Sequence, residues 1–154
     1  MIEEEFSHLD GQGHVHMVDV SSKDVTGREA VAEATVVMKP TTRDLLFAGG
    51  LPKGDALATA RIAGIMAAKR TSELIPLCHP IALTSVSIDI AATDYGASLR
   101  ATVATRDRTG VEMEAMTAVA VAALALYDMI KGVERGAHVD DLRLLSKSGG
   151  RSGE

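Results

Sequence analysis

Aromatic residues are nearly absent from this chain of 154 residues. They make up 3% of the sequence, with no tryptophan, two tyrosines and two phenylalanines. A hydrophobic core must therefore be built from alanine, valine, leucine, isoleucine and methionine, and such small side chains let backbones pack closely. The shortage also removes the flat surfaces on which single-stranded nucleic acids stack their bases.

Cysteine and clustered positive charge are also scarce. Cys78 is the only cysteine in the sequence, which excludes an internal disulfide. The net charge is −5 and the basic residues form no block, so we expect no nucleic-acid partner. A small anionic ligand, held by a few local lysines and arginines, remains compatible with this charge pattern.

Long apolar stretches are missing too. The longest nearly uninterrupted run, AMTAVAVAALALY at residues 115–127, is shorter than the roughly 20 residues that span a bilayer. The first residues, MIEEEFSHLDGQG, are acidic and lack the apolar segment of a secretory signal. We therefore expect a cytoplasmic protein without a membrane partner.

The composition that remains is ordinarily globular, with 46% hydrophobic and 24% charged residues. At this length the chain is most simply a single domain over residues 1–154, since no repeat or long linker marks a boundary. We expect its two ends, about residues 1–10 and 147–154, to be flexible.

Three segments have the alternation or β-branching of strands. Residues 14–20 and 30–38 predict one strand each. Residues 84–106 predict a hairpin, whose first strand alternates apolar and polar side chains on its two faces. The apolar members of that alternation are Val86, Ile88 and Ile90.

A short helix is predicted between the early strands and the hairpin. The segment PTTRDLLFAGG at residues 40–50 offers Thr41 or Thr42 as a helix cap. Gly49 and Gly50 at its end supply a stop signal.

A longer helix is predicted from Asp55 to about Leu74. Asp55 can cap its first turn, and Pro76 ends it. Small side chains at many positions would let another element approach its backbone closely. These positions are Ala60, Ala63, Gly64, Ala67 and Ala68.

A second long helix is predicted over residues 111–134, and its middle is apolar on nearly every side. Such a helix must be covered all round, and a chain this small covers only part of it with its own sheet. We therefore expect a homo-oligomer. The tail LRLLSKSGGRSGE predicts one short apolar element and then a Gly/Ser segment. The order of elements predicts an α+β fold, an antiparallel sheet with helices on one face.

The segment LIPLCHP places Cys78 and His79 between two prolines. Pro76 and Pro80 hold this segment extended and so fix where the imidazole points. Rigid presentation suits a catalytic or phosphate-binding histidine, but a plain helix-to-strand connection needs it equally. Spacing alone favours the structural reading, in which Cys78 is a small buried hydrophobe. A zinc site is not expected, because no second cysteine or nearby histidine pair is present.

Asp128 and Lys131 lie three residues apart in YDMIK, hence on one face of the second long helix. Together they offer an acid/base pair. An ordinary helical salt bridge is the more common meaning of this spacing. The preceding apolar stretch is the context that favours a pocket.

Glu112 and Glu114 lie at the start of the same helix, where carboxylates ordinarily meet the helix dipole. Glu114 and Asp128 are 14 residues apart in the sequence, which is roughly 21 Å along a continuous helix. No small substrate bridges that distance within one helix. If both ends of the helix belong to active sites, other elements or a second subunit must complete them.

Positive charge is scattered over short segments and offers possible anion sites. Lys53 precedes the capping Asp55 in KGDA, although an isolated lysine is usually solvated. The segment KSGGRSG could wrap a phosphate with backbone amides, although a Gly/Ser tail is usually mobile. The cations in such segments are Lys23, Arg28, Lys53, Lys69, Arg70, Lys147 and Arg151.

Four segments together closely resemble the cyclic pyranopterin monophosphate synthase family, accessory protein C of molybdenum cofactor biosynthesis. They are MVDVSSKDVTGREAVAEATVVM, KGDALATARIAGIMAAKRTSELIPLCHPIALTSV, RTGVEMEAMTAVAVAALALYDMIK and LLSKSGGRSG. The resemblance covers nearly the whole chain, from about Ser7 to Gly153. It implies a ferredoxin-like α+β subunit, assembled as a homo-hexamer built as a trimer of dimers, with active sites at subunit interfaces.

The resemblance also implies a reaction. Its substrate is the cyclised guanosine triphosphate, 3′,8-cyclo-7,8-dihydroguanosine 5′-triphosphate, and its products are cyclic pyranopterin monophosphate and diphosphate. No resident cofactor and no metal site built by the protein are implied. Asp128 and Lys131 are the implied catalytic acid/base pair. The implied substrate-binding residues are Asp19, Lys23, Arg28, Lys53, Lys69, Cys78, His79, Glu112, Met113, Glu114 and Lys147.

Two rival readings stay open on the sequence. A non-enzymatic oligomer that binds nucleotides or pterin phosphates would need the cations but not the pair Asp128 and Lys131. A thiol-dependent hydrolase would use Cys78 with His79, but adjacent residues in an extended segment point in opposite directions. Ile130, where a cysteine is frequent in the family, argues against an essential thiol at that position.

Overall fold

The computed structural model describes residues 7–150 of the chain, which contain four strands and four helices joined by turns and loops. In chain order they are β1 (Thr26–Val37), α1 (Pro40–Phe47), α2 (Ala56–Lys69), α3 (Thr71–Leu74), β2 (Leu83–Thr93), β3 (Gly96–Asp107), α4 (Glu112–Ile130) and β4 (His138–Ser148).

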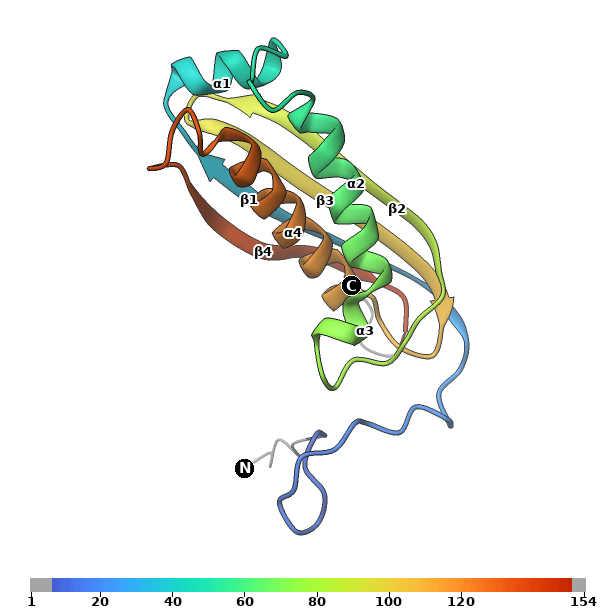
Figure 1. Ribbon diagram of the computed structural model, residues 1–154. Coiled ribbons are helices and arrows are strands. Elements are labelled where there is room, and N and C mark those ends of the chain that lie inside the picture. Colours follow the sequence, from blue (N-terminus) through green and yellow to red (C-terminus); the bar gives the residue numbers. More distant parts are fainter. Residues whose placement is uncertain (1–6, 151–154) are drawn as a thin grey trace.

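The strands form one antiparallel sheet in the order β2-β3-β1-β4, and α2 and α4 lie together on one of its faces (Figure 1). Each half of the chain contributes a strand, a helical segment and a strand, which is the split βαβ arrangement of ferredoxin-like folds. The predicted α+β fold with helices on one face is confirmed.

Small apolar side chains on the two central strands let the helices approach the sheet. On β1, alternate residues face the helices, and Ala32 and Ala34 are fully buried there. Ala32 pairs with Ala101 of β3, which is also fully buried. With so few aromatic rings, the core closes through near contact of backbones rather than through bulky side chains.

The closest helix contact is centred on Gly64 of α2. A Cβ atom on this residue would lie 2.9 Å from the carbonyl oxygen of Ala118 and 3.1 Å from the Cβ of Ala122, both in α4. It would also overlap the Cδ1 of Ile88 in β2. The prediction that small residues in this helix admit a neighbouring element is confirmed.

The first long helix is shorter than predicted, because it breaks at Arg70. Thr71 is buried, and its hydroxyl donates to the carbonyl oxygens of Ala67 and Ala68 at 3.2 and 3.0 Å. These bonds tighten the last turn of α2 and start α3 in a new direction. The predicted cap at its beginning is confirmed, since Asp55 accepts from the backbone N–H of Ala58 at 3.0 Å.

The second long helix ends at Ile130 rather than near residue 134. The backbone N–H groups of Val133 and Glu134 both donate to the carbonyl oxygen of Ile130, each at 2.9 Å. They close the chain into tight turns directly after α4. The predicted hairpin is confirmed as β2 and β3, and the apolar tail element is the full-length edge strand β4.

The predicted strand at residues 14–20 is wrong. This segment runs outward from the end of the sheet (Figure 1), and a single bridge between Leu9 and Val15 is its nearest approach to strand pairing. It pairs with neither outer strand of the sheet, and its Val18 carbonyl oxygen accepts a hydrogen bond from His79 instead. Val15 is consequently 68% exposed.

The predicted cap of the short helix is also wrong. Neither Thr41 nor Thr42 caps α1; Lys39 occupies the cap position and makes no side-chain cap bond. The hydroxyl of Thr42 instead donates to Glu134 at 2.8 Å. The stop signal after the helix is confirmed, with Gly49 in the left-handed region at φ 73°.

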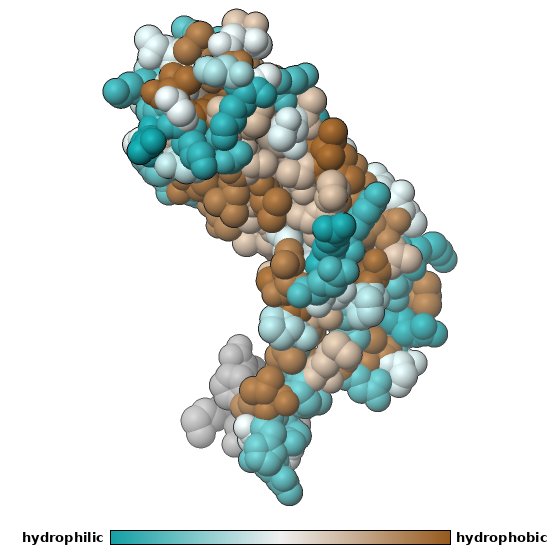
Figure 2. Space-filling view, viewed as in Figure 1, coloured by the Kyte–Doolittle hydropathy of each residue, from teal (hydrophilic) through white to brown (hydrophobic). Residues whose placement is uncertain are grey.

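Apolar side chains remain exposed on the outside of the helical layer (Figure 2). Ile62 and Leu124 are each 59% exposed, on α2 and α4 respectively. The helix α4 has the length and composition of a membrane span, but half of it is buried against the sheet and α2. It is a core helix of this fold, and Leu124 lies on the side that stays exposed.

The substitution Gly64→Ala tests the close packing of α2 and α4. Alanine favours a helix over glycine, but the Ala118 carbonyl is backbone and cannot move aside. We expect the free energy of unfolding to fall by about 1–3 kcal/mol, measured by urea denaturation. The matched control is Gly136→Ala, where no atom lies within 4 Å of the added carbon. A Gly64→Ala protein as stable as the control would show that the helices are less tightly packed.

Candidate active site

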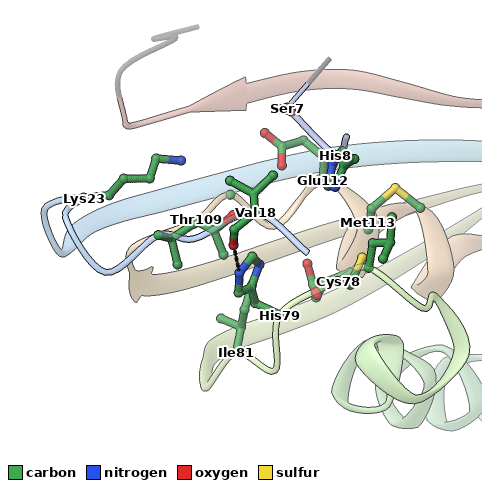
Figure 3. Close-up of a pocket in the computed structure, with 14 residues that line it drawn as sticks. Ser7, His8, Val18, Lys23, Cys78, His79, Ile81, Thr109, Glu112 and Met113 are labelled. Atoms are coloured by element: carbon green, nitrogen blue, oxygen red, sulfur yellow. Dashed lines mark hydrogen bonds between the residues drawn. The ribbon is translucent and has the colours of Figure 1, made fainter. Parts of the chain in front are cut away.

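A cavity of about 350 Å³ opens beside the start of α4, at one end of the molecule (Figure 3). Three stretches supply its lining: the segment before β2, the turn into α4, and the outward-running residues before β1. Its lining residues are Ser7, His8, Val18, Val20, Lys23, Leu77, Cys78, His79, Ile81, Thr109, Gly110, Glu112, Met113 and Glu114.

His79 holds the N-terminal segment against the cavity. Its Nε2 lies 2.6 Å from the carbonyl oxygen of Val18, and because a carbonyl only accepts, Nε2 carries the proton. The acceptor nitrogen of the neutral ring is then Nδ1. Figure 3 shows His79 turned toward Val18 and Cys78 turned toward Met113. The prediction that the whole segment is extended is wrong, because Pro76 and Leu77 form a turn in which the Cys78 N–H donates to the Ile75 carbonyl oxygen at 3.1 Å.

Glu114 is the buried acid of this cavity, with only 4% of its surface exposed. Burial raises the pKa of its carboxyl to about 7, and the negative charge of Glu112 adds to the increase. A carboxyl with this pKa exchanges its proton readily near neutral pH. Glu114 can therefore serve as a general acid or a general base.

Cys78 is a poor nucleophile in this setting. Burial raises the pKa of its thiol, and the neighbouring Glu114 raises it further. The thiolate is the reactive form of cysteine, and a raised pKa lowers the fraction of thiolate at neutral pH. Its position beside Met113 makes it part of the cavity wall (Figure 3), and the thiol-hydrolase reading loses its support.

Further charged residues surround the cavity. Lys23 lines both the main cavity and an adjacent hollow of about 200 Å³, which Arg28 and Gly150 share. Asp19 and His79 line another hollow beside it. Hydrogen bonds from the Ser21 side chain and backbone keep the pKa of Asp19 below its ordinary value, and the nearby His79 contributes.

Lys147 joins this end of the molecule from β4. Its Nζ lies 3.4 Å from Oε1 of Glu112. Glu112 therefore faces a cation, while its own negative charge raises the pKa of the buried Glu114. Arg151, the other predicted cation of the tail, lies outside the described residues.

A second charged cluster lies at the other end of α4. The Lys131 Nζ lies 2.9 Å from Oδ1 of Asp128, as their spacing predicts. Lys53 reaches the same carboxylate from the loop before α2, with its Nζ 3.4 Å from Oδ2 and 3.0 Å from the Asp128 carbonyl oxygen. The bond from Lys131, its charge and that of Lys53 lower the pKa of Asp128.

The three side chains of this cluster are about half exposed, between 45% and 56%. Exposed ion pairs contribute little to stability, so folding alone does not require two lysines on one carboxylate. The arrangement instead fixes a carboxylate in its ionised form beside two ammonium groups. It offers a base, a proton donor and positive charge for a phosphate.

The cavity and the cluster are far apart within one chain. Glu114 and Asp128 both lie in the continuous helix α4. Their 14 residues of separation correspond to roughly 21 Å, so one small molecule cannot touch both. Lys69, exposed in the last turn of α2, lines neither group.

The cavity also contains residues that sequence reasoning missed. Ser7, His8 and the backbone of Val18 belong to a segment that was predicted as flexible or as a strand. Thr109 and Gly110 belong to the polar turn before α4. No side-chain pattern reveals a backbone carbonyl as a partner, so the Val18 contact carried no sequence signal.

Among residues 7–150, no three histidine, cysteine or carboxylate side chains are grouped to hold a metal ion.

The buried carboxyl of Glu114 makes stability depend on pH. Its pKa of about 7 lies above the ordinary 4.5, so the stability gained from its protonated form is complete below about pH 4.5. That stability is lost as pH rises through 7. We expect Glu114→Gln to exceed wild type in unfolding free energy by on the order of 3 kcal/mol at pH 8, and by much less at pH 5. Urea denaturation at fixed protein concentration checks this, and an equal difference at both pH values would contradict it.

Comparison of the whole chain with known proteins identifies its family. A family model described as the MoaC family matches residues 17–150. Cyclic pyranopterin monophosphate synthase 2 of Mycobacterium bovis is 58% identical over 149 residues, which cover 97% of this chain and 89% of that protein.

Two further relatives are named cyclic pyranopterin monophosphate synthase. The one from Streptomyces avermitilis is 54% identical over 152 residues, covering 99% of this chain and 89% of its own. The one from Chloroflexus aggregans is 54% identical over 153 residues, covering 98% and 93%. The resemblance read from the sequence motifs is confirmed: the chain belongs to the MoaC family.

Proposed function

We propose that this protein is a lyase of molybdenum cofactor biosynthesis. It converts 3′,8-cyclo-7,8-dihydroguanosine 5′-triphosphate to cyclic pyranopterin monophosphate and releases diphosphate. The observation that carries this proposal is the identity of 54–58%, over nearly the whole chain, to proteins named cyclic pyranopterin monophosphate synthase. The two charged groups at the ends of α4 supply residue types that suit the chemistry.

Proton transfer is the first requirement of this reaction, because a purine-derived ring must open and a pterin ring must form. Glu114, with a pKa of about 7, is suited to take up and return a proton at neutral pH. Asp128 and Lys131, 2.9 Å apart, provide a base and a donor at the other group. These three side chains are the proposed acid/base residues.

Charge stabilisation is the second requirement. A sugar-derived hydroxyl attacks the α-phosphorus and closes the cyclic phosphate, while diphosphate carries the negative charge away. Lys23 and Arg28, which share the hollow beside the cavity, and Lys53 beside Asp128 are placed to stabilise that charge.

A second copy of the chain joins the two groups in this proposal. The cavity of one subunit receives the cluster of Lys53, Asp128 and Lys131 from its neighbour, since one chain keeps them roughly 21 Å apart. The exposed apolar side chains on α2 and α4 support such contact. The family resemblance implies a homo-hexamer, a trimer of dimers, and we propose that assembly.

The location proposed is the cytoplasm. A phosphorylated, nucleotide-derived substrate is available there, and the one helix that is apolar enough to span a membrane among residues 7–150 belongs to the core. No nucleic-acid or membrane partner is part of the proposal.

The substitution Lys131→Ala tests the reaction. Purified protein is mixed with the cyclised guanosine triphosphate, and diphosphate and pterin are followed together. We expect equal amounts of both from wild type, and a rate reduced by roughly 100-fold or more in Lys131→Ala. The control is Arg135→Ala, which removes an exposed cation four residues further along. Binding without turnover in wild type would instead favour a nucleotide-binding oligomer.

Mixing two inactive variants tests whether the site is shared between subunits. Glu114→Gln disables the cavity and Lys131→Ala disables the cluster, each in an otherwise intact chain. After unfolding and refolding together in equal amounts, chance pairing at each interface should restore about a quarter of wild-type activity. Each variant refolded alone is the control. A mixture as inactive as its components would place the whole site within one chain.

A further inference from the structure

Glu134 is a carboxylate that the two charged groups do not include. It lies four residues beyond α4, and its Oε1 accepts from the backbone N–H of Lys39 and from the hydroxyl of Thr42, each at 2.8 Å. Both partners belong to the start of α1, more than 90 residues earlier in the chain. One side chain therefore ties the end of one helix to the beginning of another.

The contact supplies what α1 lacks. The first N–H groups of a helix have no partner inside it and need a cap. Lys39, at the cap position, offers no side-chain bond, and the carboxylate of Glu134 takes that place from outside. A negative charge at a helix start is also favourable to the helix dipole. Thr42, with 2% of its surface exposed, is part of a packed contact rather than a solvated one.

The two segments that Glu134 ties together are those that form the charged cluster. The helix α1 ends at Phe47 and leads directly into the loop that carries Lys53. On the other side, the tight turns onto the Ile130 carbonyl hold Glu134 within one turn of Lys131. The contact of Lys53 with Asp128 and the contact of Glu134 with the start of α1 therefore join the same two parts of the chain, which are the region of α1 with its following loop and the end of α4.

We propose that Glu134 is a positioning residue, which holds the loop of Lys53 in register with the end of α4. The cluster needs such help because its own pairs are exposed and individually weak. Glu134 itself touches no substrate in this proposal. Its effect on turnover rests on the proposed function; its effect on Lys53 does not.

Loss of the tie has a specific consequence for Asp128. The charged groups within ion-pair distance of this carboxylate, among the described residues, are Lys131 and Lys53. If the loop moves away, Lys131 remains and Lys53 leaves, so the pKa of Asp128 rises toward its ordinary value. Activity that needs the ionised carboxylate then falls off at a higher pH than in wild type.

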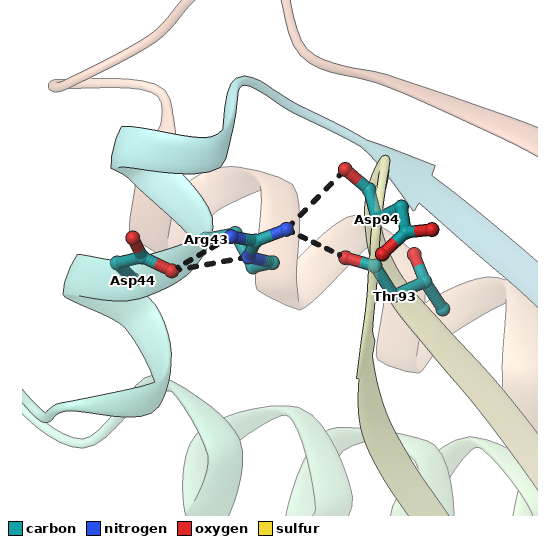
Figure 4. Close-up of polar contacts among 4 residues, drawn as sticks. All are labelled: Arg43, Asp44, Thr93 and Asp94. Atoms are coloured by element: carbon teal, nitrogen blue, oxygen red, sulfur yellow. Dashed lines mark hydrogen bonds and ion pairs between the residues drawn. The ribbon is translucent and has the colours of Figure 1, made fainter.

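Two substitutions of Glu134 distinguish the effect of its hydrogen bonds from the effect of its charge. Glu134→Ala removes both hydrogen bonds, whereas Glu134→Gln keeps an oxygen that accepts them and loses only the charge. The matched control is Arg43→Ala. Arg43 anchors the same helix α1 to the turn between β2 and β3, donating to the Thr93 and Asp94 carbonyl oxygens at 3.0 and 3.3 Å (Figure 4). Its removal leaves both hydrogen bonds of Glu134 to the start of α1 in place.

The first measurement is the rate at which an amine-specific acylating reagent labels each lysine, read by mass spectrometry. We expect Lys53 to be labelled roughly two- to fivefold faster in Glu134→Ala, the range set by exposed ion pairs. The rate at Lys69 should stay unchanged, and Glu134→Gln and Arg43→Ala should resemble wild type. An unchanged rate at Lys53 in Glu134→Ala, or the same increase in Arg43→Ala, would overturn the proposal.

The second measurement is turnover against pH. We expect kcat/KM to fall roughly tenfold in Glu134→Ala, with its acid limb moved to higher pH, and to be largely restored in Glu134→Gln. A uniform loss that follows stability in all three variants would show a merely structural role. If Glu134→Ala does not fold, Thr42→Val is used, because it removes one of the two hydrogen bonds. It should give a smaller increase in labelling at Lys53, and the absence of any increase would overturn the proposal. A wild type without turnover would refute the proposed function, and the labelling would still decide the role of Glu134.

Discussion

The burial of α4 is the constraint on which the rest of the structure depends. Its alanine-rich middle packs against β1 and β3 on one side and against Gly64 of α2 on another. A helix held along its length by backbone-close contacts is a rigid rod, so the groups at its two ends cannot approach each other. The cavity with Glu114 and the cluster with Asp128 are separated for the same reason that the core is tight. The fold therefore keeps the two groups apart within one chain, and in the proposed assembly a second chain would bring them together.

Local sequence patterns predicted many of the helices and strands, and the predictions that failed are those that long-range contacts decide. The β2–β3 hairpin and the cap at Asp55 follow from residues close together in the chain, and both were predicted. The segment 14–20 has the pattern of a strand, but it runs away from the sheet and its Val18 carbonyl oxygen bonds His79, 61 residues later in the chain. The cap of α1 failed similarly, because Glu134 lies more than 90 residues from the helix that it caps. A local propensity describes which conformation a segment prefers, but it does not identify the distant residues that the segment contacts in the folded chain.

The features of the candidate site also divide into those that local spacing predicts and those that depend on distant residues. The spacing of Asp128 and Lys131 predicted a contact on one helix face, and the geometry agrees at 2.9 Å. Spacing could not predict that Lys53 completes the group, because 75 residues separate it from Asp128. Burial of Glu114 was equally beyond a local reading, since a glutamate in a first helical turn is usually exposed to water and to the helix dipole. The family motifs marked these residues as important, but only the packing explains how their chemistry differs.

That difference in environment separates the two groups by protonation state. Around Glu114 and Cys78, burial opposes charge, so the cavity favours neutral acids that exchange protons near pH 7. Around Asp128, two cations and open solvent favour the ionised carboxylate. Covering the cluster with a second subunit would remove that solvent and strengthen the attraction between Asp128 and its lysines. A triphosphate in the cavity would act in the opposite sense on Glu114, since added negative charge further disfavours its ionisation. Under the proposed function, association and substrate binding would thus widen the difference in charge that the isolated chain already shows between the buried carboxyl of Glu114 and the ionised carboxylate of Asp128.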